Sequence, residues 1–258
     1  MGALSCVAGA SVALRPGQAL AAPRPVVEQA FCLVIDPGHG GENHGCEAYG
    51  GHGLREKSVT LILARELQRR VVELMPNAQV LLTREADETL HLNQRVRFAN
   101  EVGADLFMSL HCNASPHANQ TGFETFLLDA KASSEQAALT ALRENDEGYA
   151  APRPADDEVS TMLRELSLTN NRKRAALYAQ ALQREQARRF PKRIDRGVRQ
   201  ANFDVLMGAR MPAVLHEVGF LDHPEDSQLI LEDDQRGALI EALAQATLSY
   251  FNTVVRRG

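Results

Sequence analysis

Short apolar runs alternate with helical patterns along this 258-residue sequence, and that alternation limits the folds open to it. The apolar runs carry strand-forming residues, and the stretches between the first three repeat apolar residues every three or four positions. Neighbouring parallel strands need such crossover helices. We therefore predict an α/β fold: a single three-layer domain with a mostly parallel central sheet of about six strands, flanked by helices. The predicted strands are 31–35, 79–83, 104–110, 122–128, 203–207 and 213–218.

Two of the predicted strands lead directly into histidines. His39 follows the turn Asp36-Pro37-Gly38, and His111 follows the run 104–110. Glu56 stands at the start of the first predicted helix, and Glu217 lies near the carboxyl end of the last strand. In a parallel sheet, strand ends and the helix starts that follow them share one edge. We therefore expect all four side chains at that edge.

Each of these residues also has a structural explanation. A histidine in a tight turn can be structural, and a glutamate in the first turn of a helix is favoured by the helix dipole. Glu217 is harder to explain in this way, because a charged residue in an apolar strand is costly unless it is paired or used.

Taken together, the four residues suit zinc chemistry. Two histidines and one glutamate with an open fourth position are typical of catalytic zinc, which lowers the pKa of bound water and polarises a carbonyl. Glu217 is then free to act as the general base. The reaction that this set suits best is hydrolysis of an amide.

Six segments, in the same order along the chain, resemble the zinc-dependent N-acetylmuramoyl-L-alanine amidases of the type-3 family. The resemblance spans about 31–251 and implies zinc ligands at His39, Glu56 and His111 and a catalytic glutamate at Glu217. It implies cleavage of the amide between N-acetylmuramic acid and L-alanine in peptidoglycan, and a role in wall remodelling and daughter-cell separation. The segments are IDPGHGG at 35–41, GLREKSV at 53–59, LLTR at 81–84, RVRFAN at 95–100, ADLFMSLHCNA at 104–114 and PAVLHEVGF at 212–220.

The sequence departs from the family pattern at two positions: His216 replaces an apolar residue, and Cys112 replaces alanine. Neither position carries a required function. Two alternative functions stay open. One is a degenerate amidase kept as a peptidoglycan-binding scaffold, and the other is a zinc hydrolase of this fold that cleaves a different amide.

Composition excludes several other classes of function. The formal net charge of −5 gives no electrostatic reason to expect binding to nucleic acid or an anionic membrane. No apolar run approaches the ~20 residues of a transmembrane helix.

The four cysteines, Cys6, Cys32, Cys46 and Cys112, show no zinc-finger spacing. Cys32 and Cys112 fall in predicted strands as small apolar residues. Cys46 lies in a glycine-rich loop, where a free thiol could stand near a metal.

The first 25 residues differ from the rest. An apolar stretch at 3–14 precedes Ala19-Leu20-Ala21, which fits a signal-peptidase site, although no Lys or Arg lies ahead of the apolar stretch. We predict a signal peptide, or otherwise a flexible leader, at 1–25 and the catalytic domain at 26–258. The expected location is the periplasm or outside the cell.

The segment 129–170 reads as an insertion into the domain. It contains a predicted helix at 132–145, a stretch rich in Gly, Pro and acidic residues at 146–157, and a second helix from about 158. In the family members that serve cell division in Gram-negative bacteria, an insertion here covers the zinc cleft until an activator protein displaces it. The resemblance implies that an acidic residue fills the open zinc position, with Glu135 the first candidate and Glu144 the second. The other interpretation is a surface excursion with solvated acids.

Overall fold

The computed structural model describes residues 30–51, 53–115, 119–145 and 158–255, with side chains from Thr169 onward in the last range. The predicted leader and the stretch 146–157 lie outside the described residues. In the part of the chain that the structure describes, no helix is long and apolar enough to cross a membrane.

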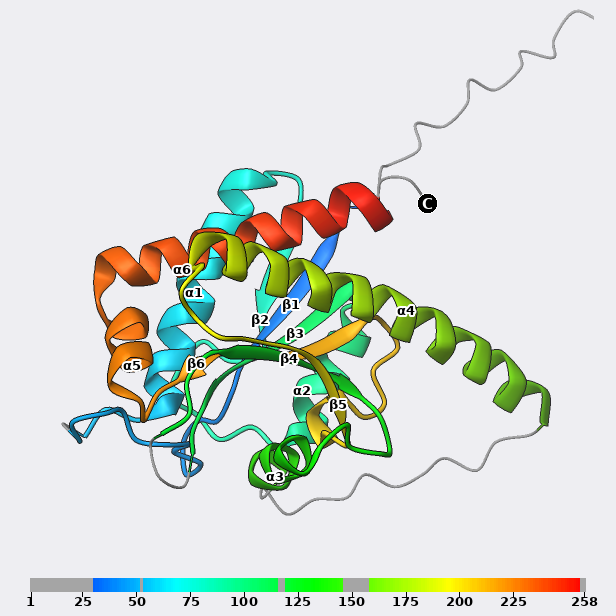
Figure 1. Cartoon of the computed structure of the whole chain (residues 1–258). Coiled ribbons are helices and arrows are strands. Elements are labelled where there is room, and N and C mark those ends of the chain that lie inside the picture. Colours follow the sequence, from blue (N-terminus) through cyan, green and yellow to red (C-terminus); the bar gives the residue numbers. More distant parts are fainter. Residues whose placement is uncertain (1–29, 52, 116–118, 146–157, 256–258) are drawn as a thin grey trace, which may run out of the picture.

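A six-stranded sheet in the order β2-β1-β3-β6-β4-β5 forms the centre of the molecule (Figure 1). All neighbouring strands are parallel except the pair β4 and β6, which is antiparallel. The predicted α/β fold with a mostly parallel sheet is therefore confirmed. The strands are β1 (Cys32–Pro37), β2 (Gln79–Leu82), β3 (Leu106–Asn113), β4 (Phe123–Leu128), β5 (Asp195–Ala201) and β6 (Ala213–Phe220).

Helices cover both faces of the sheet. Alternate residues of β1 point to opposite faces, so that Leu33 and Ile35 join one buried cluster and Val34 joins another. The first cluster takes in α1 (Glu56–Leu74), α4 (Glu158–Arg189), α5 (Pro224–Leu231) and α6 (Asp233–Tyr250), and the second takes in α2 (Leu92–Glu101) and α3 (Glu135–Glu144). A π-helical turn, η2 (Phe251–Val255), follows α6.

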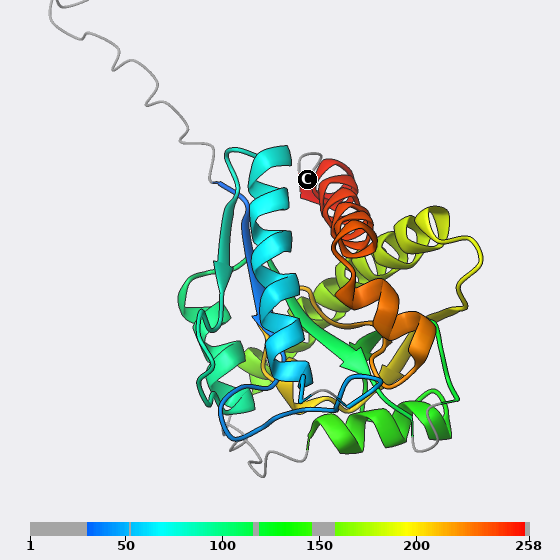
Figure 2. The same cartoon turned by 90° about the vertical axis from the view of Figure 1, so that its left-hand side faces the viewer.

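The helix α3 lies at the edge where β1, β3 and β6 end. Both views show it beside the segment that follows β1 (Figures 1 and 2). Ser134 caps its first turn by accepting a hydrogen bond from the amide of Ala137 at 3.1 Å. The edge at which the sequence predicts a site is thus covered by α3.

Two elements differ from the sequence prediction. The predicted strand at 203–207 is a short 3-10 helix, η1 (Asp204–Leu206), whose Val205 and Leu206 are buried. The actual strand is β5, an edge strand of mainly polar residues that presents no apolar run to detect. The helix α5 was also not predicted, although Pro224 at its first position is a typical helix start.

Candidate metal centre

His39 lies just beyond β1 in a conformation that few non-glycine residues adopt, with a φ of 61°. Its Nδ1 makes a hydrogen bond of 2.8 Å with Oδ1 of Asn43. A partner on one ring nitrogen fixes the orientation of the ring and leaves the other nitrogen available as a ligand. The Nε2 atom of His39 consequently faces the interior of the site.

Two buried arginines hold the turn that carries His39. Arg95 donates to the carbonyl of His39 at 2.8 Å and to the carboxylate of Asp36 at 2.9 Å. Arg84 donates through one nitrogen to the carbonyls of Gly38 at 2.9 Å and Lys57 at 2.7 Å. Because Lys57 is the neighbour of Glu56, Arg84 ties the His39 turn to the helix start that supplies the carboxylate.

Glu56 is almost fully buried in the first turn of α1. The amide of Cys112 donates to its Oε1 at 2.8 Å, and the amide of Cys46 donates to its Oε2 at 3.1 Å. The same oxygens lie 3.4 Å from Nδ1 of His111 and 3.0 Å from Nε2 of His39. The carboxylate is therefore anchored on one side and faces both imidazoles on the other.

His111 is contributed by β3 and packs against Gly38. A Cβ atom built on Gly38 would stand 2.4 Å from Cε1 of His111, closer than real Cβ contacts come. The two imidazole rings meet edge to face, with centroids 4.8 Å apart. The ring of His111 thus fits a space that exists because residue 38 has no side chain.

Glu144, at the end of α3, completes the group. Its Oε2 lies 3.0 Å from Nδ1 of His111 and 3.3 Å from Nε2 of His39. Glu135, the first candidate for this position, was the wrong choice of the two: it is exposed in the first turn of α3. Nine residues are two and a half helical turns, so the two glutamates project from opposite faces of the helix.

These four side chains suit a metal ion. One ligand atom from each of His39, Glu56, His111 and Glu144 lies within 4.8 Å of the other three, and all four residues are buried. Among the described residues, Nε2 of His39, Nδ1 of His111 and Oε2 of Glu144 have no hydrogen-bond partner. Lone pairs that converge without pairing are what a cation requires, and this set of nitrogen and oxygen donors is one that zinc accepts.

Glu217 lies beside this cluster and not within it. It is fully buried on β6, directly across from His111 on β3. Its carboxylate has no hydrogen-bond partner among the described residues, and Nη2 of Arg143 lies 3.7 Å away. Burial, and then the nearby charge of Glu144, raise the pKa of Glu217 well above its usual value. A group whose pKa is raised in this way is suited to accept a proton.

Residues that the sequence left without a role also border the centre. Arg143 contacts Glu217 and Glu144, and Asn113 ends β3 next to the cluster. The only sequence signal for the helper residues Arg84, Arg95 and Asn113 was their position inside segments that resemble the family. Periodicity alone gave no reason to select them.

The unusual residues near the site are structural. His216 is buried, with Nδ1 bonded to Oγ1 of Thr125 at 2.9 Å and Nε2 bonded to Oε1 of Gln186 at 2.8 Å. Burial, with a further contribution from Arg193, lowers the pKa of His216 to about 3, so it stays neutral. Burial raises the pKa of the Cys46 thiol well above its usual value, which disfavours the thiolate that binds metals. Cys32, Cys46 and Cys112 are all free thiols.

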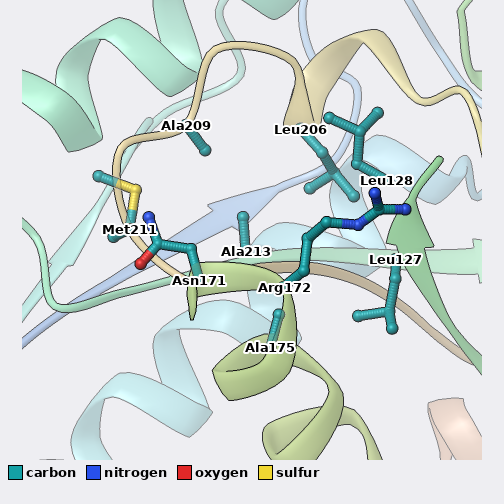
Figure 3. A pocket seen from close by; sticks show the side chains of 9 residues that line it. All are labelled: Leu127, Leu128, Asn171, Arg172, Ala175, Leu206, Ala209, Met211 and Ala213. Atoms are coloured by element: carbon teal, nitrogen blue, oxygen red, sulfur yellow. The ribbon is translucent and has the colours of Figure 1, made fainter. Parts of the chain in front are cut away.

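A cleft opens beside the cluster and leads to solvent. It has a volume of about 640 Å³ and is lined by residues of the His39 turn, Glu56, His91 and Arg143. A second hollow, shown in Figure 3, has a volume of only about 40 Å³ and lies near the start of β6, at the opposite edge of the sheet. The first has the size of a ligand site, whereas the second is far smaller.

A group of metal-type donors at the carboxyl edge of a mostly parallel sheet, with a buried carboxylate beside it, is the arrangement that a metal-dependent hydrolase needs. Comparison with known families supports the assignment as a hydrolase. The family model described as N-acetylmuramoyl-L-alanine amidase matches residues 33–249, and the chain belongs to that family.

Known proteins of similar sequence carry the same description. The chain is 32% identical over 255 residues to the amidase AmiC of Neisseria meningitidis serogroup B, covering 95% of this chain and 57% of that protein. It is 32% identical over 224 residues to the amidase AmiA of Escherichia coli K12, covering 85% of this chain and 76% of that protein. The chain therefore spans little more than half of the first relative.

Solved structures support the same fold. The amidase from Clostridium difficile 630 superposes with a TM-score of 0.65 at 27% identity, covering 88% of this chain and 99% of that one. The catalytic domain of the amidase CwlV from Paenibacillus polymyxa var. colistinus superposes with a TM-score of 0.63 at 25% identity, covering 86% and 98%.

Proposed function

We propose that this chain is a zinc-dependent peptidoglycan hydrolase that cleaves the amide between N-acetylmuramic acid and the L-alanine of the stem peptide. In this proposal His39, Glu56 and His111 hold the zinc ion and Glu217 is the general base. The observation that carries it is the convergence of two imidazole nitrogens and the carboxylate oxygens of Glu56 and Glu144 beside the buried Glu217, whose carboxylate accepts no hydrogen bond among the described residues. Membership of the amidase family supports the choice of bond.

The protein's own residues account for the proton transfers. Glu217 takes a proton from the attacking water as the new C–O bond forms, and it delivers that proton to the nitrogen as the C–N bond breaks. The products are a carboxylate on the lactyl group and an amine on the peptide. Bound zinc would supply polarisation of the carbonyl and a lower pKa for the water.

We also propose that α3 keeps the enzyme in a resting state. Glu144 stands where an incoming water or a substrate carbonyl needs to reach the cluster, and Arg143 lies against the proposed general base. A wall hydrolase without restraint would damage its own cell. In this proposal an activator protein displaces α3, and the insertion is about 129–170.

Two further proposals concern the cell. The substrate lies outside the cytoplasmic membrane, so we propose that residues 1–25 direct export to the periplasm and that the enzyme contributes to wall remodelling and daughter-cell separation. Fractionation of cells that express the full chain tests the first proposal. Chains of unseparated cells after gene deletion are the expected result for the second, and normal separation would contradict it.

The deciding experiment is mass spectrometry of the products from purified sacculi. Zinc-loaded wild type and Glu144→Ala protein should release intact stem peptides with a free L-alanine amino terminus, and a chelator should abolish that release. Release of peptides cut at another amide would favour the alternative hydrolase. A zinc-loaded protein that binds sacculi and releases nothing would favour the scaffold. Glu217→Gln protein is the matched inactive control.

A further inference from the structure

The guanidinium group of Arg143 lies next to Glu217. Its Nη1 donates to the carbonyl of Ala114 at 2.7 Å, and its Nη2 donates to Oδ1 of Asn113 at 2.9 Å. The same Nη2 lies 3.7 Å from Oε1 of Glu217. A cationic, N–H-bearing group is therefore surrounded by three acceptors at the end of β3.

The orientation of the Asn113 side chain is fixed from behind. Its Nδ2 donates to Oε1 of Glu124 at 2.6 Å, and Glu124 is itself held by Arg199 at 2.7 Å and by Arg196 at 3.3 Å. A carboxylate paired with two guanidinium groups can only accept hydrogen bonds, so the amide nitrogen of Asn113 must face it. The amide oxygen of Asn113 is consequently turned toward Arg143 and the centre.

Oδ1 of Asn113 can accept a hydrogen bond from a ligand once Arg143 has moved away. One donor to Oδ1 of Asn113 is the amide of Ala114, at 3.0 Å, and it belongs to the fold. The other is Arg143, which belongs to α3. When α3 moves away, Oδ1 of Asn113 and the carbonyl of Ala114 each lose a donor beside the proposed general base, which leaves two buried or half-buried acceptors in need of N–H groups.

Arg143 and Glu144 together resemble the products of amide hydrolysis. The carboxylate of Glu144 lies against both imidazoles, and its Oε1 is 2.8 Å from Nη2 of Arg143. Hydrolysis of an amide yields a carboxylate and an amine, side by side, because the bond that joined them has just broken. The two side chains thus present an acid at the cluster and a cationic nitrogen beside Glu217.

We propose that Oδ1 of Asn113 and the carbonyl of Ala114 form the subsite for the nitrogen of the leaving amine. This inference rests on the proposed hydrolysis. As the C–O bond forms and the C–N bond breaks, the nitrogen keeps its own proton and gains the one carried by Glu217. The planar amide has a single N–H, whereas the departing amine has at least two. Both acceptors are satisfied only late in the reaction, so the subsite favours the transition state over the bound substrate.

A purely structural role for Asn113 predicts the opposite outcome. If Asn113 serves only to hold α3 through Arg143, its removal should loosen α3 and raise the activity. If it binds the leaving nitrogen, its removal should lower the activity even when α3 no longer blocks the site. The sign of the change therefore separates the two roles.

The test uses the full-length, zinc-loaded chain with Arg143→Ala and Glu144→Ala, which empties both positions without removing the helix. Adding Asn113→Ala should lower kcat on a muramoyl peptide roughly 10- to 100-fold, as expected for one hydrogen bond to a charged group, with little change in KM or zinc content. Asn100→Ala is the matched control, since Asn100 also bonds backbone groups, at Gly208 and Arg210, but lies away from the centre. An unchanged or increased kcat with Asn113→Ala would overturn the proposal.

A binding measurement tests the subsite without relying on enzyme turnover. A tripeptide with a free L-alanine amine should bind the Arg143→Ala/Glu144→Ala chain roughly tenfold more weakly once Asn113→Ala is added, and its N-acetylated form should not respond. Equal binding of the free amine to both proteins would contradict the subsite. If the amine binding depends on Asn113 but no variant releases stem peptides from sacculi, the proposed function fails and the subsite stands.

A second variant covers the case in which Asn113→Ala does not fold. Glu124→Gln keeps Asn113 but allows its amide to turn, because a glutamine side chain can both donate and accept. We expect a smaller loss of kcat in the same direction. An increase in kcat with Glu124→Gln would count against the proposal.

Discussion

The candidate metal centre is built from two regions that are attached to the protein in different ways. His39, Glu56 and His111 come from the end of β1, the start of α1 and β3, which lie in the main core. Glu144 comes from α3, whose inward face consists of Ala137, Thr140, Ala141 and Glu144 itself. The large apolar residues of α3 point outward, with Leu139 52% and Leu142 70% exposed.

This difference has an energetic meaning. Burial of a large aliphatic side chain contributes roughly 1.5–3 kcal/mol, whereas the methyl group of an alanine contributes about 0.8 kcal/mol. The helix α1 buries Val59, Leu63, Leu67 and Val71, but α3 buries mainly small side chains and relies on polar contacts. Three of the proposed ligands are thus part of the main core, and Glu144 is on an element that is held by fewer apolar contacts.

The strongest test of the fixed region removes one of its ligands. In the Glu144→Ala background, His39→Ala or His111→Ala should reduce the bound zinc from about one per chain to almost none and abolish wall digestion, because two protein ligands remain where a catalytic site has three. Metal analysis of the purified, folded variants measures this. Full zinc occupancy in either variant would show that the ligand set is wrong.

The next largest effect separates Glu217 from the ligands. Glu217→Gln should retain zinc and lose turnover by a factor of about 10² or more, because glutamine cannot accept the proton. Zinc content and product release are measured on the same sample. Parallel loss of metal and activity would instead make Glu217 a ligand.

The comparison is tested most directly on α3. Glu144→Ala should retain zinc and raise basal wall digestion, roughly tenfold if one charge-assisted contact is lost. Glu135→Ala is the matched control, since it removes the same group from the exposed face of the same helix, and it should change nothing. Loss of zinc in Glu144→Ala, or equal effects of the two variants, would refute the resting-state proposal.

The last test concerns the fixed region behind Glu217 and measures stability in place of activity. The folded-state pKa of His216 is about 3, below its ordinary value, so the unfolded chain binds this proton more readily. Stability is therefore fully present above about pH 6.5 and falls by about 1.4 kcal/mol per pH unit as the pH drops toward 3. His216→Gln should remove that one-proton slope in urea unfolding between pH 7 and 4. A slope equal to that of the wild type would contradict the pKa shift.

The sequence predicted the fixed region well because each of its elements carries a local pattern. The apolar residues of β1, of α1 and of β3 are buried in the core. Burial selects apolar residues at regular spacing, and that spacing is what makes an element detectable in the sequence. The strand β5 escaped detection because an edge strand of polar residues has no such pattern.

The choice between Glu135 and Glu144 in α3 is a different problem. Glu135, Leu139 and Leu142 share one face of the helix, and an apolar stripe normally indicates the buried face. In this protein that face is exposed, and the face with Glu144 is buried. Local pattern cannot show which face meets the sheet when the buried side is chosen by polar contacts to the centre.

Gly38 shows how the centre limits change in the sequence. The φ angle of Gly38 is not positive, so its backbone conformation does not require glycine. An added methyl group would nevertheless overlap the ring of His111. Gly38→Ala should therefore displace the ring of His111 and weaken metal binding, although it changes none of the proposed ligands. Around the centre, a position that must lack a side chain is therefore as intolerant of substitution as a position that supplies a proposed ligand. We expect a scan of variants to place Gly38→Ala among the substitutions of the proposed ligands.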